Sequence, residues 1–426
     1  MDTLVYIILI CEAAFGLALL FFSGVLKEPK HVLISAVLLA AAFFLRGKML
    51  SYETLDYQNF LSQWVDYFRE NGGLQGLAGS IGNYNAPYLT FLALFSQSST
   101  PDLYLIKLLS IFFDVVLAWS VMMLAGRFTQ SAERRLVAFF LTLFWPTVVL
   151  NGALWGQCDS IYVAFSVLSI YLVLAKKPWL GVLCIGAAFA FKLQAVFFIP
   201  VFLLFWITDR VKWYHFAAFP VINVVLVLPA VLMGRGLWDA LTIGLQETGS
   251  IGDGLNYNSP SIFAILSKIT NTEQASTLAI LVAGLAVVLI AIVFLQKRKT
   301  ASDKSLLLGA ALMVIVIPFL LPHMHDRYFF GADMMSLATG CAVLPLMPVA
   351  LLCEFASLLG YHAYLKMRYL LLMYWGAWAL VIAMGVLSVA LYFELNRKPA
   401  APSKSTKKKP SQAKKPATKK KPQKAK

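Results

Sequence analysis

The chain has 426 residues, of which 60% are hydrophobic and 13% charged, and its mean hydropathy is +0.74. A chain of this length with so few charges is too apolar for a water-soluble globular protein. The net charge of +15 would suit a nucleic-acid-binding protein, but thirteen of the 36 basic residues lie in residues 397–426, which contain no acid. The other 23 basic residues nearly balance the 21 acids, so the composition indicates a membrane protein and no nucleic-acid partner.

Apolar runs recur along the chain, from residues 4–26 at one end to residues 370–393 at the other. A transmembrane helix needs about 20 mostly apolar residues. The runs predict an all-α, polytopic body over residues 1–396 with about thirteen transmembrane helices. The first run lacks a basic segment and a cleavage site, so we interpret it as the first helix and not as a signal peptide. The five scattered cysteines form no CxxC pair and indicate neither a disulfide framework nor a zinc site.

Basic residues occur in every second short loop, which is typical of cytoplasmic loops. These loops contain Lys27 and Lys30; Arg127, Arg134 and Arg135; Lys176 and Lys177; Arg210 and Lys212; and Lys297, Arg298, Lys299 and Lys304. Lys366 and Arg368 are exceptions on the other side. The unusual polar segments then all fall on the extracytoplasmic face. The Lys-rich residues 397–426 are predicted to be a disordered cytoplasmic tail that contacts anionic lipid headgroups.

The first extracytoplasmic loop is long and is expected to carry short helices. It contains LDYQNFLSQW, with Asp56 and Tyr57, and GNYNAPYL, with Asn83, Tyr84 and Asn85. Glycosyl transfer needs a carboxylate that accepts a proton, and amides and aromatic rings hold sugars. Asp56 is close to the end of a predicted span, where a lipid-borne substrate presents its phosphate. The alternative interpretation is that the acids of this loop form a solvated helix face.

Two further polar motifs interrupt apolar runs. LWGQCDS contains Trp155, Gln157 and Asp159, and FKLQA contains Lys192 and Gln194. Polar groups at membrane depth cost free energy, which favours a functional interpretation. Interfacial anchoring of the Trp and snorkelling of the Lys remain the alternatives.

The segments GRGLWD and PHMHDRYFF supply basic groups in later loops. Arg235 directly follows a predicted span, and an arginine can hold a phosphate leaving group with a bidentate fork. His325 and Arg327 are candidates for phosphate or sugar contacts. Metal ligation by His323, His325 and Asp326 is a weaker alternative, because this spacing alone is a poor metal signal.

Three acids fall within predicted spans: Glu12, Asp114 and Glu354. An ionisable residue within a membrane span is a candidate functional residue by default. The sequence offers no partner for any of them, and hydrogen bonding between helices is an equal alternative.

In this order, LDYQNFLSQW, GNYNAPYL, LWGQCDS, FKLQA with GRGLW, and PHMHDRYFF resemble the motifs of the GT-C superfamily, specifically bacterial relatives of GPI-anchor mannosyltransferases. The resemblance spans most of residues 1–396. This sequence reads NYNAPYL where eukaryotic members have a double proline, and it reads HDRY where several members have HEK or HER. No DxD motif is present, so no obligatory metal or other cofactor is expected.

The resemblance implies an inverting enzyme that uses a polyprenyl-phosphate hexose, with mannose favoured, on the extracytoplasmic face of the cell membrane. Asp56 matches the family's first-loop aspartate and would be the general base. Arg235 and His325 would hold the carrier phosphate, with Arg327 and Lys192 as helpers. Tyr57, Asn83, Tyr84, Asn85, Trp155, Gln157, Asp159 and Gln194 would contact sugar or acceptor, which is a glycan, lipid or protein of the cell envelope.

Two other functions stay open at this stage. A transporter or flippase of a phosphate-bearing lipid or glycan would also be polytopic, although no internal repeat is evident. A non-catalytic scaffold recruited through the Lys-rich tail is the second alternative.

Overall fold

The computed structural model describes residues 3–246, 254–266 and 268–397. Met1–Leu395 form one compact unit. The helices are α1 (Thr3–Phe22), α2 (Pro29–Gly47), α3 (Ser62–Glu70), α4 (Ala86–Phe95), α5 (Asp102–Ala125), α6 (Ala132–Phe144), α7 (Pro146–Val149), α8 (Asp159–Leu174), α9 (Pro178–Phe191), α10 (Val201–Ile207), α11 (Ala218–Leu232), α12 (Leu237–Gln246), α13 (Thr272–Gln296), α14 (Asp303–Leu320), α15 (Phe330–Ala342), α16 (Met347–Leu365) and α17 (Tyr374–Leu395). The tail predicted at 397–426 lies outside the described residues, apart from Arg397.

Short irregular elements connect the long helices. They include the π-helical turns η1 (Tyr57–Leu61) and η3 (Leu150–Trp155) and the 3-10 turns η2 (Gly73–Ala78), η4 (Leu193–Phe197), η5 (Trp213–Ala217), η7 (Ile262–Ala264) and η8 (Leu344–Leu346). The strands β1 (Asn256–Tyr257) and β2 (Met324–His325) form a parallel pair of two residues each. The described body is otherwise helical, and the first long loop carries short helices.

The expected count of thirteen spans is not confirmed. Among the described residues, eight helices are long and apolar enough to cross a membrane, or nine if α6 and Pro146–Trp155, which meet at 48°, form one span. The difference has a physical cause. Helices α8 and α9 have only 16 and 14 residues, yet most of their residues are buried and their sequences are as apolar as a spanning helix. Hydropathy alone does not distinguish a short helix buried in protein from a helix that spans lipid.

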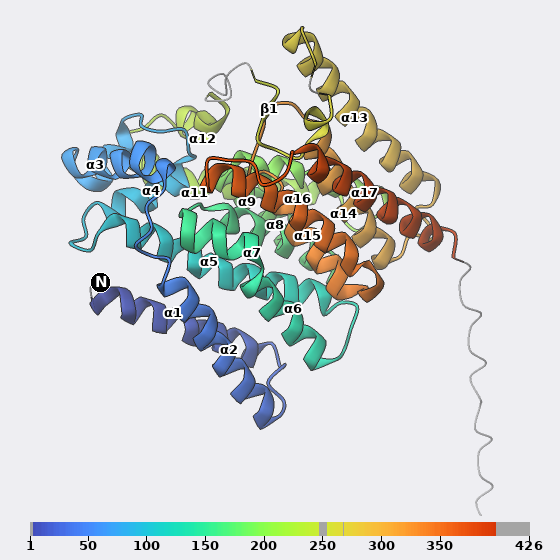
Figure 1. Cartoon of the computed structure of the whole chain (residues 1–426), viewed down its shortest axis with the longest axis horizontal. Helices are drawn as coiled ribbons and strands as arrows, with labels where there is room; N and C mark the ends of the chain where they lie inside the picture. Colours follow the sequence, from blue (N-terminus) through green and yellow to red (C-terminus); the bar gives the residue numbers. More distant parts are fainter. Residues whose placement is uncertain (1–2, 247–253, 267, 398–426) are drawn as a thin grey trace, which may run out of the picture. The chain divides into compact units, whose positions relative to one another are not determined.

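Burial separates the interior helices from the peripheral ones. In α5 and α14, 72% and 78% of an 18-residue window is buried, whereas the figure for α13 is 22%. Helices α1 and α2 pack against α5 and α6 as a second hydrophobic cluster (Figure 1). The larger cluster contains α8, α9, α14, α15 and α16. The outward side chains of α1, α2 and α13 are large and apolar, as expected for lipid contact.

A buried ion pair joins α2 to the interior. Arg46 lies inside α2 and is fully buried. Its Nη2 and Nε donate to Asp114 Oδ2 on α5 at 3.0 and 3.1 Å, and Ser160 donates to Oδ1 of the same carboxylate. Arg46 also donates to the backbone carbonyl of Leu143 at 2.9 Å. Asp114, for which the sequence offered no partner, is thus paired with Arg46.

Contacts between loops fall into two sets. In one set, Arg135 donates to Ser23, Arg127 donates to Leu174, and both Arg127 and Arg210 pair with Asp303. These loops are the ones predicted to be cytoplasmic. The other set joins residue 54 to 155, residue 84 to 157, residue 79 to 235 and residue 258 to 369. The grouping matches the predicted alternation of loops, and which set faces the cytoplasm stays a prediction.

Arg46→Met should destabilise the protein, because it leaves the Asp114 carboxylate buried beside no cation. Breaking a buried pair in this way costs about 3 to 5 kcal/mol. We expect the midpoint of thermal unfolding in detergent, followed by tryptophan fluorescence, to fall by more than about 5 °C. Arg134→Met, at an exposed position on α6, is the control and should change the midpoint little. Equal midpoints for the two variants would contradict a stabilising role for the pair.

Candidate active site

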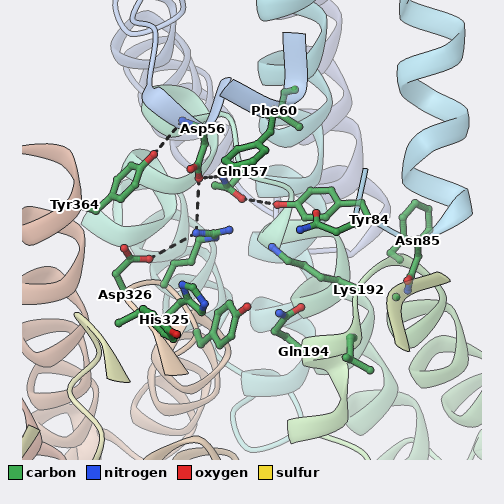
Figure 2. Close-up of a pocket in the computed structure, with 18 of the residues that line it drawn as sticks. Asp56, Phe60, Tyr84, Asn85, Gln157, Lys192, Gln194, His325, Asp326 and Tyr364 are labelled. Carbon is green, nitrogen blue, oxygen red and sulfur yellow. Dashed lines mark hydrogen bonds and ion pairs between the residues drawn. The ribbon is translucent and has the colours of Figure 1, made fainter. Parts of the chain in front are cut away.

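A cavity of about 430 Å³ lies where polar turns from distant parts of the chain meet (Figure 2). Its walls come from η1, the start of α4, the segment after η3, the break that follows α9, and the β2 turn. Nine candidate residues line it: Asp56, Asn83, Tyr84, Asn85, Gln157, Lys192, Gln194, His325 and Arg327. The volume lies within the usual range of small-molecule pockets.

The Asp56 carboxylate is fixed by two donors. Trp155 Nε1 and Gln157 Nε2 both donate to Oδ2, at 2.9 and 2.8 Å. The Asp56 backbone N–H donates to the Tyr364 hydroxyl at 3.0 Å. The side chain is 19% exposed, so this acid is largely removed from water but still reaches the cavity. These contacts give the carboxylate one defined orientation.

The two donors lie on a strongly bent segment. Pro146 begins a new helix at 48° to α6, and the π-helical turn η3 ends at Gly156. Gly156 has φ +80°, a left-handed conformation that glycine adopts without strain, and the chain reverses there so that Gln157 N donates to the Asn151 carbonyl. The Gln157 carbonyl accepts from Ser110 at 2.7 Å, which ties the reversal to α5.

Helix α16 holds this segment through three of its side chains. Glu354 accepts from the backbone N–H and the hydroxyl of Thr147, at 2.9 and 2.8 Å. Two turns further along, the Tyr361 hydroxyl accepts from Asn151 Nδ2 at 2.8 Å. The ring of Tyr364, one turn beyond that, stacks on Trp155 at 4.1 Å. Glu354 is therefore a structural partner for the start of α7, and α16 positions the indole that donates to Asp56.

The Arg327 guanidinium lies among three carboxylates. Its Nη1 is 3.7 Å from Asp56 Oδ2 and 3.6 Å from Asp326 Oδ1, and its Nε is 3.8 Å from Asp159 Oδ2. Its central carbon also lies 5.2 Å from the centre of the Trp155 ring. These separations exceed a hydrogen bond, so the guanidinium is attracted to all three acids without being locked to one.

A second cation is paired more tightly. The chain breaks from helix at Lys192, and this residue's Nζ donates to Asp159 Oδ1 at 2.5 Å. Asp159 begins α8, where the helix dipole favours a negative charge, and Asn151 donates to its other oxygen. Lys192 Nζ also lies 5.2 Å from the Tyr84 ring, and the Tyr84 hydroxyl donates to Gln157 Oε1 at 2.9 Å. Burial raises the pKa of Tyr84 to about 12, so this phenol stays protonated.

The β1–β2 pair presents His325 to the cavity. Tyr257 pairs with His325 along the two strands, and their rings stack at 4.7 Å. Helix α16 packs closely against the backbone of Asp326 at Gly360. A Cβ added at this glycine would lie 2.5 Å from the Asp326 carbonyl oxygen. Only a glycine lets the helix and the turn approach so closely. Figure 2 shows Asp56, Lys192 and His325 facing one space from three different elements.

Burial sets the charge of two groups in this turn. It lowers the pKa of His325 to about 4, with the nearby Arg327 charge acting in the same direction, so the imidazole is neutral at physiological pH. It raises the pKa of Asp326 to about 7, and this effect exceeds the opposing attraction of Arg327. Near neutral pH the two cations therefore face Asp56, Asp159 and a partly protonated third acid.

Several sequence candidates lie outside the cavity wall. Trp155 and Asp159 contact residues that line it, as described above. The Tyr57 hydroxyl donates to Asp102 at 3.1 Å. Arg235 follows α11, whose end packs against the first long loop, and its guanidinium donates to the Gly79 carbonyl at 3.1 Å and contacts Ser80 at 3.4 Å. The structure thus does not place Arg235 with His325.

His323 also points elsewhere. It has a positive φ of 58°, its Nδ1 lies 2.8 Å from the Gly254 carbonyl oxygen, and its Nε2 lies 3.1 Å from the Ser276 hydroxyl on α13. Both ring nitrogens are thereby engaged with the neighbouring loop and helix. The residue supports the turn that carries His325.

The sequence model of glycosyltransferase family 87 matches residues 83–322, which is more than half of the chain. The chain belongs to this family. It is therefore a glycosyltransferase of the GT-C membrane type, and the expected resemblance is confirmed at that level. A search of curated proteins found no match to this chain. The matched part of this family 87 enzyme includes Tyr84, Trp155 and Lys192, whereas Asp56 and His325 lie outside it.

Family membership decides between the classes left open by the sequence. A glycosyltransferase is an enzyme, so the transporter and scaffold interpretations are not needed. The family leaves the sugar, the donor and the acceptor unspecified.

Some residues of the cavity were not candidates from the sequence. Tyr364, Tyr257, Asn258 and Trp64 also line it, and Asp326 does so as an acid and not as a metal candidate. Aromatic residues near helix ends are ordinary in membrane proteins, so no local signal marked them. Only the packing of α3, α16 and the β1–β2 pair brings them to the site.

Proposed function

We propose that this family 87 enzyme transfers a hexose from a polyprenyl-phosphate carrier to a hydroxyl group of an acceptor, with inversion at the anomeric carbon. The observation that supports this most is the convergence in one cavity of an oriented carboxylate and two cations, with Asp56 Oδ2 only 3.7 Å from Arg327 Nη1. Mannose, an acceptor of the cell envelope and an extracytoplasmic active site follow from the resemblance and from the predicted topology.

In the proposed reaction, Asp56 accepts the proton of the acceptor hydroxyl while the oxygen of that hydroxyl bonds to the anomeric carbon. The bond between that carbon and the phosphate oxygen breaks, and its electron pair leaves with the polyprenyl phosphate. Trp155 and Gln157 orient the carboxylate through Oδ2. General-base assistance of this kind contributes about 10² to 10⁴-fold to the rate.

Arg327 and Lys192 are the proposed partners of the carrier phosphate. Both line the cavity, and both already contact carboxylates, Lys192 one and Arg327 three, that an anionic substrate would replace in part. Neutral His325 supplies a hydrogen bond and no charge. Arg235 has no part in this proposal, because its guanidinium is engaged with Gly79 and Ser80 outside the cavity wall.

The sugar or acceptor would lie against the remaining polar wall. Asn83, Tyr84 and Gln194 line the cavity beside Lys192. Asn85 lines it too, and its Nδ2 donates to the Phe189 carbonyl at 3.0 Å. Amides and an aromatic face together suit a hexose.

Asp56→Asn should lower kcat by about 10² to 10⁴-fold, because the amide cannot accept the proton. The measurement is release of prenyl phosphate from a short-chain prenyl-phosphate mannose, with native envelope lipids and glycans as acceptors. Asp66→Asn is the matched control, since Asp66 lies on the same loop but its side chain is 60% exposed. Activity of the Asp56 variant within about threefold of wild type, while donor binding is unchanged, would contradict the proposal.

Donor affinity should rise as the pH falls from 8 to 6. Asp326, with a pKa raised to about 7, takes up a proton over this range and stops competing for Arg327. A prenyl hexosyl phosphodiester keeps a single charge across the range, so its Kd, measured calorimetrically, reports on the protein. We expect an increase of about threefold or more in affinity. Asp326→Asn should bind tightly at both pH values, and an undiminished pH dependence in that variant would contradict the assignment.

A further inference from the structure

A second cluster of titratable side chains lies away from the cavity, at the first turns of α2 and α6. Glu28 precedes α2, His31 lies in its first turn, and Glu133 lies in the first turn of α6. One ligand atom from each residue lies within 4.8 Å of the other two. Among the described residues, no other group of three His, Cys or acidic side chains converges in this way.

The burial of His31 points to a ligand. This side chain belongs to the inward stripe of α2 with Ser35, Leu39 and Arg46, and the residue is only 4% exposed. Neither ring nitrogen has a hydrogen-bond partner, although Nε2 lies 3.4 Å from Glu133 Oε1. Buried polar nitrogens without partners are rare in folded proteins because each costs free energy. The imidazole is aimed at the two carboxylates without bonding to either.

We propose that Glu28, His31 and Glu133 bind a divalent transition-metal ion of the Zn²⁺ class. One imidazole nitrogen and two carboxylate oxygens are ligands that such ions accept, whereas Mg²⁺ and Ca²⁺ prefer oxygen alone. Bond lengths of about 2.0 to 2.2 Å require the three ligand atoms to draw closer. The two glutamates allow this, because their side chains are 53% and 61% exposed and sit at helix ends. Water would complete the coordination.

The bound ion would tie α2 to α6. Helix α2 buries only a third of its spanning window, and its other end is fixed by the Arg46–Asp114 pair. A metal at Glu28, His31 and Glu133 would fix the first end, so that both ends of the helix leading toward Asp56 are held by polar contacts. Lys30, which lies 2.9 Å from Glu28 Oε2, is the competing cation that the metal would displace.

The test uses the full chain in detergent, purified with an affinity tag that contains no histidine and treated with a chelator. Residues 397–426 contain no His, Cys or acid, so the tail adds no competing ligand. Co²⁺ is titrated at pH 7.5 and followed by its visible absorption, and Zn²⁺ is then added to displace it. We expect one Co²⁺ per chain, displaced by one Zn²⁺, and a thermal midpoint that rises with Zn²⁺.

Two variants decide whether the ion lies at this cluster. His31→Ala and the isosteric Glu133→Gln should each weaken Co²⁺ binding by about tenfold or more. Because Glu133 is exposed, its variant is expected to fold even if the His31 variant does not. His362→Ala, on α16, is the control and should bind as wild type does. Binding of less than half an equivalent by wild type, or equal affinity in wild type and Glu133→Gln, would overturn the proposal.

Discussion

The position of Arg327 among three carboxylates is the interaction on which the geometry of the cavity depends. Asp56, Asp159 and Asp326 come from three separate parts of the chain, and each lies within 4 Å of the Arg327 guanidinium. Acids brought this close together would repel one another without a cation between them, and burial would add a desolvation cost. Arg327 and Lys192 oppose that repulsion, because each lies beside one or more of these carboxylates. They also leave cations in the cavity that an anionic substrate can share.

The helices around the cavity convert this charge arrangement into a defined orientation. Helix α16 contacts Thr147, Asn151 and Trp155 along one face, and through Trp155 it fixes Asp56. The same helix supports the His325 turn from below at Gly360. One helix therefore packs against both the segment that orients the proposed base and the turn that carries Arg327. Catalytic groups held by such packing need little rearrangement when the substrate binds.

Much of the cavity could be predicted from the sequence for a simple physical reason. Gln157, Lys192 and His325 are polar residues inside apolar surroundings, and that contrast is visible locally because burying such groups is costly. The partners of polar groups are not visible in the same way. Asp114 with Arg46 and Glu354 with Thr147 are separated by 68 and 207 residues, so only the packing of helices reveals them. Arg235 looked like a phosphate ligand because it follows a span, but the loop that packs on it decides its contacts. The count of thirteen spans is not confirmed for a related reason, since a protein-covered helix is as apolar as a lipid-covered one.

The most direct test of the account is a cryo-electron microscopy map of the purified enzyme with a short-chain prenyl phosphate bound. We expect phosphate density inside the cavity, within hydrogen-bonding distance of Arg327 and Lys192 and on the same side as Asp56. Density for the headgroup beside Arg235, or at the face formed by Arg127, Arg210 and Asp303, would contradict it.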